Sequence, residues 1–291
     1  QIIDQIVTRD VIIESGFGSA QINGAEMYNQ GIEFSIQSQW FKNESCSWKT
    51  SFNFTKIKNK VTALTGLGSD FSGAESARSQ TIGYPTSALW GYNFIGIDPG
   101  TGRELFNVDG QIYDSAAVAS QFDSSDWRPI GNTQPDFYGG MRNNFSYKNF
   151  NLGIIMSYTY GSDFLVDRTL YDNYRVLSNR NISVNIFEDA WLNQGDTAIH
   201  PIIAKNNRII SNSSKYLFDT SHIKLKSVSL SYNLPVNKYR LPLKSLSFIL
   251  NGSNLYYWFK DKSPKGKNGV AEFRNRYPEM RTFTLGINTT F

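Results

Sequence analysis

The chain has a single cysteine and no long apolar run, and each absence excludes a structural class. Cys46 has no second cysteine in the chain, so no internal disulfide holds the fold together. The best apolar stretch, Phe150 to Tyr160, is interrupted by Asn151, Gly153 and Ser157. It also falls short of the roughly 20 apolar residues that a spanning helix needs. If this chain crosses a membrane, it must therefore do so with β-strands.

Strong charge and catalytic motifs are also missing. The net charge of +4 comes from scattered residues, which argues against a nucleic-acid partner. His200 and His222 have no cysteine or second histidine nearby in the sequence, so no metal site is predicted. There is no Gly-x-Ser-x-Gly motif and no glycine-rich phosphate loop. We predict neither an enzyme nor a bound cofactor.

What the chain does have is alternation, and it is clearest from Tyr277 to Phe291. Phe283, Leu285, Ile287 and Phe291 share one face of the expected strand, whereas Thr, Gly and Asn occupy the other. A soluble sheet would present Lys and Glu to water, but a membrane barrel lines its water-filled interior with small polar residues. The mean hydropathy of −0.38 does not oppose this, because the two faces cancel in the average. The predicted fold is all-β, a transmembrane antiparallel β-barrel.

Three hairpins follow from the same alternation. Asn43-Glu44-Ser45 and Lys148-Asn149 are the expected tight turns of the first two. A change of phase in the apolar row predicts a bulge near Lys226-Ser227 in the third. The predicted strands are Gly31 to Phe41 with its partner from Trp48 to Thr55, Asp136 to Tyr147 with Phe150 to Tyr160, and Ile223 to Leu234 with Ser245 to Trp258.

Unequal connections give an orientation, because such barrels keep short turns in the periplasm and long loops outside. Pro235 to Lys244 is then periplasmic, and Gly161 to about Thr220 is external. The same parity requires zero or two spanning strands between the strand at Trp48 and the strand at Asp136. Tyr84 to Ile97 and Gly102 to Asn107 are the candidates, joined by a turn at Asp98-Pro99-Gly100-Thr101.

An ordered set of short motifs resembles a known family. The set comprises Met27-Tyr28-Asn29 before Gly31-Ile32-Glu33-Phe34, Asn53-Phe54-Thr55 with Asn59-Lys60-Val61, Gly131 to Phe137 leading to Gly140, Lys226 to Pro235, Gly252-Ser253-Asn254-Leu255, and Tyr277-Pro278 leading to Phe291. It resembles the C-terminal barrel half of the SusC/RagA family of TonB-dependent outer-membrane transporters from Bacteroidota. The resemblance spans nearly the whole chain in the right order.

The resemblance carries several expectations. Family barrels have about 22 strands, of which residues 1–291 would supply about eight to ten as the C-terminal part of one barrel domain. The plug, the TonB-contacting segment and the secretion signal are expected to lie outside this chain. Expected partners are a SusD-like surface lipoprotein, TonB through that missing part, the lipid bilayer with lipopolysaccharide, and the barrel-assembly machinery. Phe291 would be the assembly signal, and the location is the outer membrane of a Gram-negative bacterium, as a multi-pass β-barrel.

Candidate sites fall in the expected external loops. Substrate-binding aromatics are predicted at Phe122 and Trp127, and at Tyr171, Tyr174 and Trp191, although packing of the loops on themselves or on a lid is the favoured explanation. The short acceptor pattern for O-glycosylation occurs at Ser115 and Thr197. The spacing of the acidic residues in the first loop does not fit an EF-hand, so a solvated acidic loop is favoured over calcium; these residues are Asp98, Asp109, Asp114, Asp123 and Asp126.

Three functions remain open on this basis. The main hypothesis is import of a bulky nutrient, a glycan or a peptide, driven through TonB. The first alternative is a SusC-like barrel used as a structural or docking subunit of an outer-membrane complex. The second is a surface glycan-binding β-protein, whose apolar rows would have to face a second sheet.

Overall fold

The computed structural model describes residues 2–10, 16, 19–64, 81–166, 187–203, 210–240, 242–261 and 279–291. They divide into two compact units. The strand unit comprises Gly31–Ile57, Pro135–Ser162 and Asp219–Phe291, and the loop unit comprises Gln1–Gln30, Lys58–Gln134 and Asp163–Phe218.

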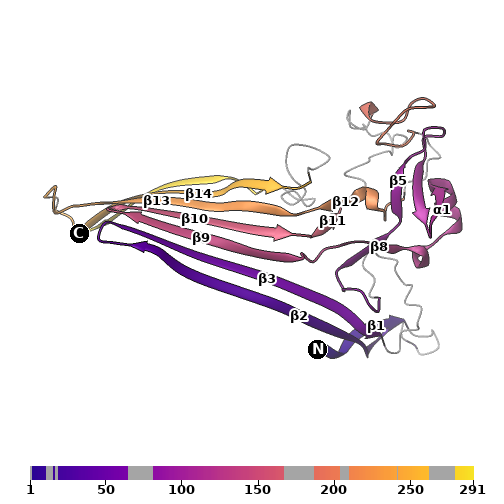
Figure 1. Cartoon of the computed structure of the whole chain (residues 1–291), viewed down its shortest axis with the longest axis horizontal. Helices are drawn as coiled ribbons and strands as arrows, with labels where there is room; N and C mark the ends of the chain where they lie inside the picture. Colours follow the sequence, from indigo (N-terminus) through magenta and orange to yellow (C-terminus); the bar gives the residue numbers. More distant parts are fainter. Residues whose placement is uncertain are drawn as a thin grey trace. The chain divides into compact units, whose positions relative to one another are not determined.

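One eight-stranded antiparallel sheet dominates the chain (Figure 1). The strands of this sheet pair in the order in which they occur along the chain, so the sheet winds up and down, and β1 and β15 are its two edges among the described residues. The all-β, antiparallel class is therefore confirmed, and the eight strands of this sheet among the described residues agree with the predicted eight to ten. In sheet order the strands are β1 (Ile2–Asp10), β2 (Ser19–Lys42), β3 (Cys46–Leu64), β9 (Phe137–Tyr147), β10 (Phe150–Tyr160), β13 (His222–Leu234), β14 (Ser245–Phe259) and β15 (Thr282–Thr290).

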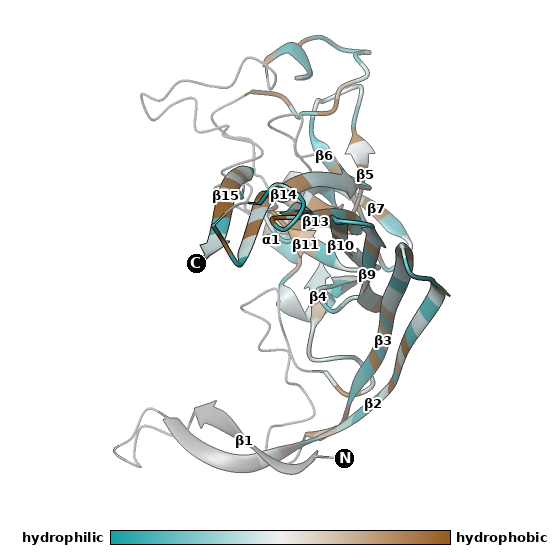
Figure 2. Ribbon diagram, turned by 90° about the vertical axis from the view of Figure 1, so that its left-hand side faces the viewer, coloured by the Kyte–Doolittle hydropathy of each residue, from teal (hydrophilic) through white to brown (hydrophobic). Residues whose placement is uncertain are grey.

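The strand unit has one apolar and one polar face, as the alternation predicts. Residues that pair across neighbouring strands share a face, and alternating bands of hydropathy run along β2 and β3 in Figure 2. One apolar cross-strand row is Trp48, Phe145, Leu152, Leu230, Leu250 and Leu285. The next row, on the opposite face, is Lys49, Asn144, Gly153, Ser229, Asn251 and Thr284.

The predicted turns and bulge of this unit are confirmed. Asn43 closes the first turn, because its Oδ1 accepts the backbone N–H groups of Ser45 at 3.0 Å and Cys46 at 2.7 Å. Lys148 adopts a left-handed conformation, with φ of 49°, in the second turn. The pairing of β13 with β10 shifts register between Leu225 and Ser227, so Lys226 is the extra residue of the bulge.

Of the zero or two additional spanning strands that parity allows, the structure has zero, so the candidates Tyr84 to Ile97 and Gly102 to Asn107 do not span. β9 pairs directly with β3, and no strand intervenes. The turn at Asp98 is present, but it joins a small hairpin of the loop unit. This unit contains β4 (Ala88–Gly91), β5 (Asn93–Ile97), β6 (Glu104–Val108), β7 (Gln111–Asp114), β8 (Arg128–Asn132), β11 (Asp163–Leu165), the first residues of β12 (Leu217–Asp219), α1 (Ser115–Gln121) and 3-10 turns at Ser124–Asp126 and Ser214–Tyr216.

The physical reason that these segments do not span is a second core. Tyr92, Phe106, Val108 and Val118 bury their side chains together, so alternation in β5 and β6 covers a local core rather than spanning a bilayer. A buried ion pair adds to it, because Lys215 Nζ lies 2.8 Å from Glu104 Oε1. No helix within the described ranges is long and apolar enough to cross a membrane.

Candidate functional site

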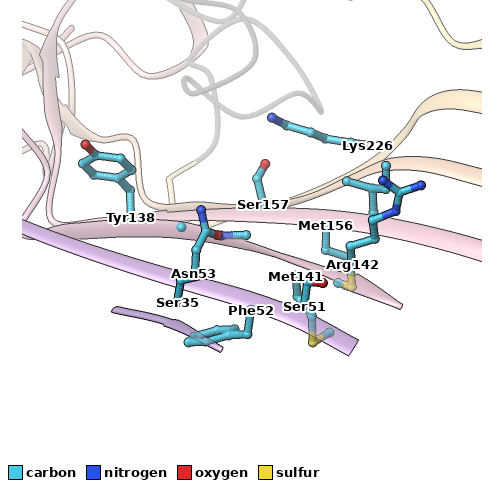
Figure 3. Close-up of a pocket in the computed structure, with 13 residues that line it drawn as sticks. Ser35, Ser51, Phe52, Asn53, Tyr138, Met141, Arg142, Met156, Ser157 and Lys226 are labelled. Carbon is cyan, nitrogen blue, oxygen red and sulfur yellow. The ribbon is translucent and has the colours of Figure 1, made fainter. Parts of the chain in front are cut away.

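A hollow on the polar face of the strand unit is the clearest candidate site. It measures about 440 Å³ and is lined by residues of β2, β3, β9, β10 and β13. Figure 3 shows Asn53, Tyr138, Ser157 and Lys226 on one side of the strands, whereas Phe52 points to the other side. The hollow is therefore open on the face that a barrel would turn toward its interior.

Glycine shapes the floor of this hollow. Gly140 lies between Asn53 of β3 and Ser157 of β10 in one cross-strand row. Its N–H group donates to Asn53 Oδ1 at 2.5 Å. A Cβ at this position would approach Met156 O at 3.1 Å and that same Asn53 oxygen at 3.3 Å. The missing side chain thus leaves space between the flanking polar residues.

Two cations line the hollow, and both are exposed. Arg142 lies in the middle of β9 and Lys226 at the bulge of β13. Within the described ranges, the Arg142 guanidinium forms one hydrogen bond, from its Nε to Asn144 Oδ1 at 3.4 Å. Neither cation forms a salt bridge with another described residue. Both can therefore interact with an anionic group that enters the hollow.

Lys224, one row away, shows a different arrangement. It is buried, forms a salt bridge with Glu279 and lies over the ring of Tyr257, with its Nζ 4.9 Å from the ring centroid. Its charge is thereby compensated within the chain. The bulge is what distinguishes the two lysines, because it adds Lys226 to the polar face while Val228 resumes the apolar row.

The aromatic residues predicted in the first loop pack inside the loop unit. Phe122 makes an edge contact with Tyr113 at a centroid distance of 4.8 Å, and Trp127 does the same with Tyr92 at 6.4 Å. All four adjoin or belong to the small core. Burial, followed by the nearby Asp126 carboxylate, raises the pKa of Tyr92 to about 12, so it stays a neutral donor to Asp123 O at 2.7 Å. These contacts supply the packing alternative for Phe122 and Trp127.

Trp191 stabilises the predicted turn at Asp98-Pro99-Gly100-Thr101 in the same unit. Its Nε1 donates to Pro99 O at 2.9 Å. Gly102, with φ of 69°, lies so close that a Cβ there would be 2.5 Å from the Trp191 ring. The sequence predicts the turn and contains the tryptophan, but it does not predict that the two are in contact. The predicted aromatics Tyr171 and Tyr174 lie outside the described residues.

The acidic residues of the first loop act as caps. The Thr101 hydroxyl holds the pKa of Asp98 below its ordinary value, and the Ala117 amide, followed by Arg103, does so for Asp114 at the N-terminus of α1. Within the described ranges, no group of three or more His, Cys, Asp or Glu residues could hold a metal ion. Asp109 instead pairs with Arg128, so turns, caps and one ion pair account for the acidic residues of this loop.

The two predicted glycosylation positions differ in access. Ser115 begins α1 and is fully buried, so its hydroxyl could not carry a sugar in this structure. Thr197 lies on an exposed stretch of the loop unit and stays a prediction. Phe291 is 80% exposed beyond the end of β15, and its role as an assembly signal also stays a prediction.

The chain is similar in sequence to several TonB-dependent receptors. No family model matches the chain. It is 27% identical to TonB-dependent receptor P3 of Formosa agariphila over 99% of this chain and 31% of that protein. It is 28% identical to receptor P26 of the same bacterium over 96% of the chain and 30% of that protein. The corresponding values for TonB-dependent receptor SusC of Bacteroides thetaiotaomicron are 22%, 92% and 27%.

Two solved structures share the fold. The match to the RagAB peptide transporter has a TM-score of 0.76 and covers 99% of this chain and 32% of the transporter chain. The match to the RagAB peptide importer in its open-open state has a TM-score of 0.79 and covers 99% of this chain and 31% of the importer chain. Sequence identity is 20% in both. The chain thus spans about a third of the length of the relatives that it matches.

Proposed function

Because the chain matches the C-terminal part of SusC/RagA-type TonB-dependent receptors in sequence and in fold, we propose that it forms part of the wall of an outer-membrane importer. The observation that carries this proposal is the division of one antiparallel sheet into an apolar face and a small, polar face. A barrel wall needs both, one toward lipid and one toward water.

Exposure of the apolar face supports a membrane environment. Phe283 and Leu285 are 71% and 76% exposed, and apolar residues of β2, β13 and β14 are exposed to a lesser degree. A contiguous apolar surface of this kind is rare on soluble monomers. In the alternative β-sandwich these side chains would be covered by a second sheet. Among the described residues no sheet covers them, so the soluble glycan-binding alternative is disfavoured.

The finer parts of the proposal concern cargo, energy and partner. We infer a bulky solute, a peptide or a glycan, because the RagAB structures are of a peptide transporter and because nutrients of that size exceed passive pores. Energy would come through TonB, and a SusD-like lipoprotein would close the external side, as the resemblance to SusC/RagA-type receptors implies.

The test is made on the full-length protein in its native bacterium. An in-frame deletion should abolish growth on one complex glycan or peptide source while leaving growth on its monomers intact, and loss of TonB should reproduce that defect. A surface lipoprotein should co-purify with the full-length protein in detergent. Co-purification of partners without any TonB-dependent growth would instead support the structural-subunit alternative.

A further inference from the structure

The hollow on the polar face is positively charged, because two cations line it. Its two cations lie on β9 and β13, and β10 is the strand between them. Arg142 pairs with Ile155, which in turn pairs with Ser227, the residue next to Lys226. Two strand spacings amount to about 10 Å, a span that two long side chains can close around one small group.

The surrounding chemistry favours an anion. The other side chains lining the polar side of the hollow are neutral, namely Ser35, Ser51, Asn53, Tyr138, Ile155 and Ser157. No described acidic residue pairs with either cation, although Lys224 next to them is paired. Hydroxyl and amide groups at the rim could complete the hydrogen bonds of a bound carboxylate.

We propose that this hollow binds a carboxylate group of the transported solute, with Arg142 and Lys226 as the two anion contacts. This inference rests on the proposed import function and adds the charge of the cargo. The planar guanidinium offers a fork that matches a carboxylate, and the lysine adds a point charge from the opposite strand. Carboxylates are also the anionic groups that both peptides and acidic glycans can carry.

The geometry explains why the bulge is placed here. Without the extra residue, the apolar row of β13 could not resume at Val228 after a polar Lys226. The neighbouring strand β14 is irregular at the same height, and Asn254 adopts φ of 55° there. Bulges are over-represented next to functional sites because they redirect a side chain at the expense of regular pairing.

Two fluorescent probes test the proposal on the full-length protein in detergent: a ten-residue oligoglutamate and a galacturonate oligomer. Fluorescence anisotropy should show that at least one of them binds more tightly than a neutral oligomer of the same length. The double variant Arg142→Gln and Lys226→Gln should weaken that binding about tenfold, which is a typical effect for charge-assisted contacts in a partly exposed site. The tighter probe would identify the carboxylate source.

The matched control removes two lysines at the ends of strands, away from the hollow. Lys42→Gln with Lys244→Gln changes the net charge equally and should leave the affinity within twofold. The reversed variant Arg142→Glu with Lys226→Glu should bind a ten-residue oligolysine instead. This reversal keeps the test informative if the neutral variant loses expression.

Two results would overturn the proposal. One is equal affinity of the wild type and the double variant for both acidic probes. If the double variant then also gains ion conductance in planar bilayers, the two cations hold another part of the transporter's own chain. The other result is a wild type that binds neither acidic probe. Because binding is measured without TonB, failure of uptake alone would count against the import function and not against this site.

Discussion

At the residue scale, Asn143 shows how a polar side chain is accommodated on the apolar face. Its Oδ1 accepts hydrogen bonds from Trp48 Nε1 at 3.0 Å and from Thr50 Oγ1 at 2.6 Å. The Thr50 hydroxyl oxygen in turn accepts from Trp40 Nε1 at 3.0 Å. In hydrocarbon every unsatisfied polar group is costly, so this network makes the polar atoms compatible with lipid.

Replacing Asn143 tests that network. Asn143→Leu leaves two donors without their acceptor and should lower the free energy of unfolding of the full-length protein by about 1 to 3 kcal/mol. Urea titration in lipid vesicles, followed by tryptophan fluorescence, measures this. Asn144→Leu on the polar face is the control, because water can replace the lost contacts there. Equal losses for the two variants would contradict a lipid-facing network.

The assignment of faces along β10 gives a second prediction at the residue scale. Ile154→Arg should cost about 2 to 4 kcal/mol and impair assembly, because its side chain lies on the apolar face in the middle part of β10. Leu152→Arg lies on the same face but nearer the turn, so it should cost less and still impair assembly. Ser157→Arg on the polar face should be tolerated. The yield of heat-modifiable protein in outer membranes is the readout. Equal tolerance at all three positions would remove the barrel assignment.

At the element scale, β9 and β3 are joined closely around Gly139. A Cβ there would lie 2.1 Å from Asn53 O and 2.5 Å from Tyr158 Oη. The Tyr158 hydroxyl donates to that same Asn53 oxygen at 2.9 Å and so covers the glycine. This tyrosine therefore bridges from β10 across β9 to β3, and only glycine fits beneath it.

A methyl group at this position should separate the strands. Gly139→Ala is expected to destabilise the full-length protein by about 1 to 3 kcal/mol through overpacking. Gly153→Ala is the matched control, because the nearest atom to its Cβ is 3.5 Å away. Thermal loss of heat-modifiable mobility on gels compares the two. A control variant as unstable as Gly139→Ala would contradict the steric explanation.

The caps of the loop unit respond to acid. The folded-state pKa values of Asp98, Asp114 and Asp123 lie below the ordinary value of 3.8, chiefly because Thr101, Ala117 and Ser125 respectively donate hydrogen bonds to them. Their contribution is present above pH 3.8 and is lost as the pH falls through the lowered values. Hydrogen-exchange protection of the three amides at Gly100, Ala117 and Ser125, corrected for intrinsic rates, should thus be constant from pH 7 to about 5 and fall below about 4. Asp114→Asn should remove the pH dependence at Ala117 alone.

At the scale of the whole molecule, the open edges matter most. The described sheet ends at β1 on one side and at β15 on the other. In lipid each open edge would leave a row of unpaired backbone groups, which a membrane cannot accommodate. We therefore expect further strands to complete the barrel; the relatives that the chain matches are about three times longer than it is.

Expression of residues 1–291 alone, with a secretion signal, tests this requirement. We expect no heat-modifiable, protease-resistant band in the outer membrane, whereas the full-length protein should give one. The full-length protein carrying Leu152→Arg supplies a misassembled reference. A folded band from residues 1–291 alone would show that these strands close by themselves or between copies.

Much of the strand unit was predictable because its rules are local. β10 has the predicted bounds, and β9, β13 and β14 differ from theirs by one residue. Successive side chains of a strand point to opposite faces, so a strand between lipid and water alternates apolar and polar residues. The sequence alone therefore determined the faces, the turns and the bulge at Lys226. The family resemblance rested on the same ordered segments.

The tertiary structure alone decided where distant residues meet. The same alternation in β5 and β6 suits a spanning strand or a small core, and only the packing of Phe106 against Tyr92 separates the two. Likewise, Arg142 and Lys226 are 84 positions apart in the sequence, and no local pattern links them. They share a hollow because cross-strand register, a long-range property of the folded sheet, places them there.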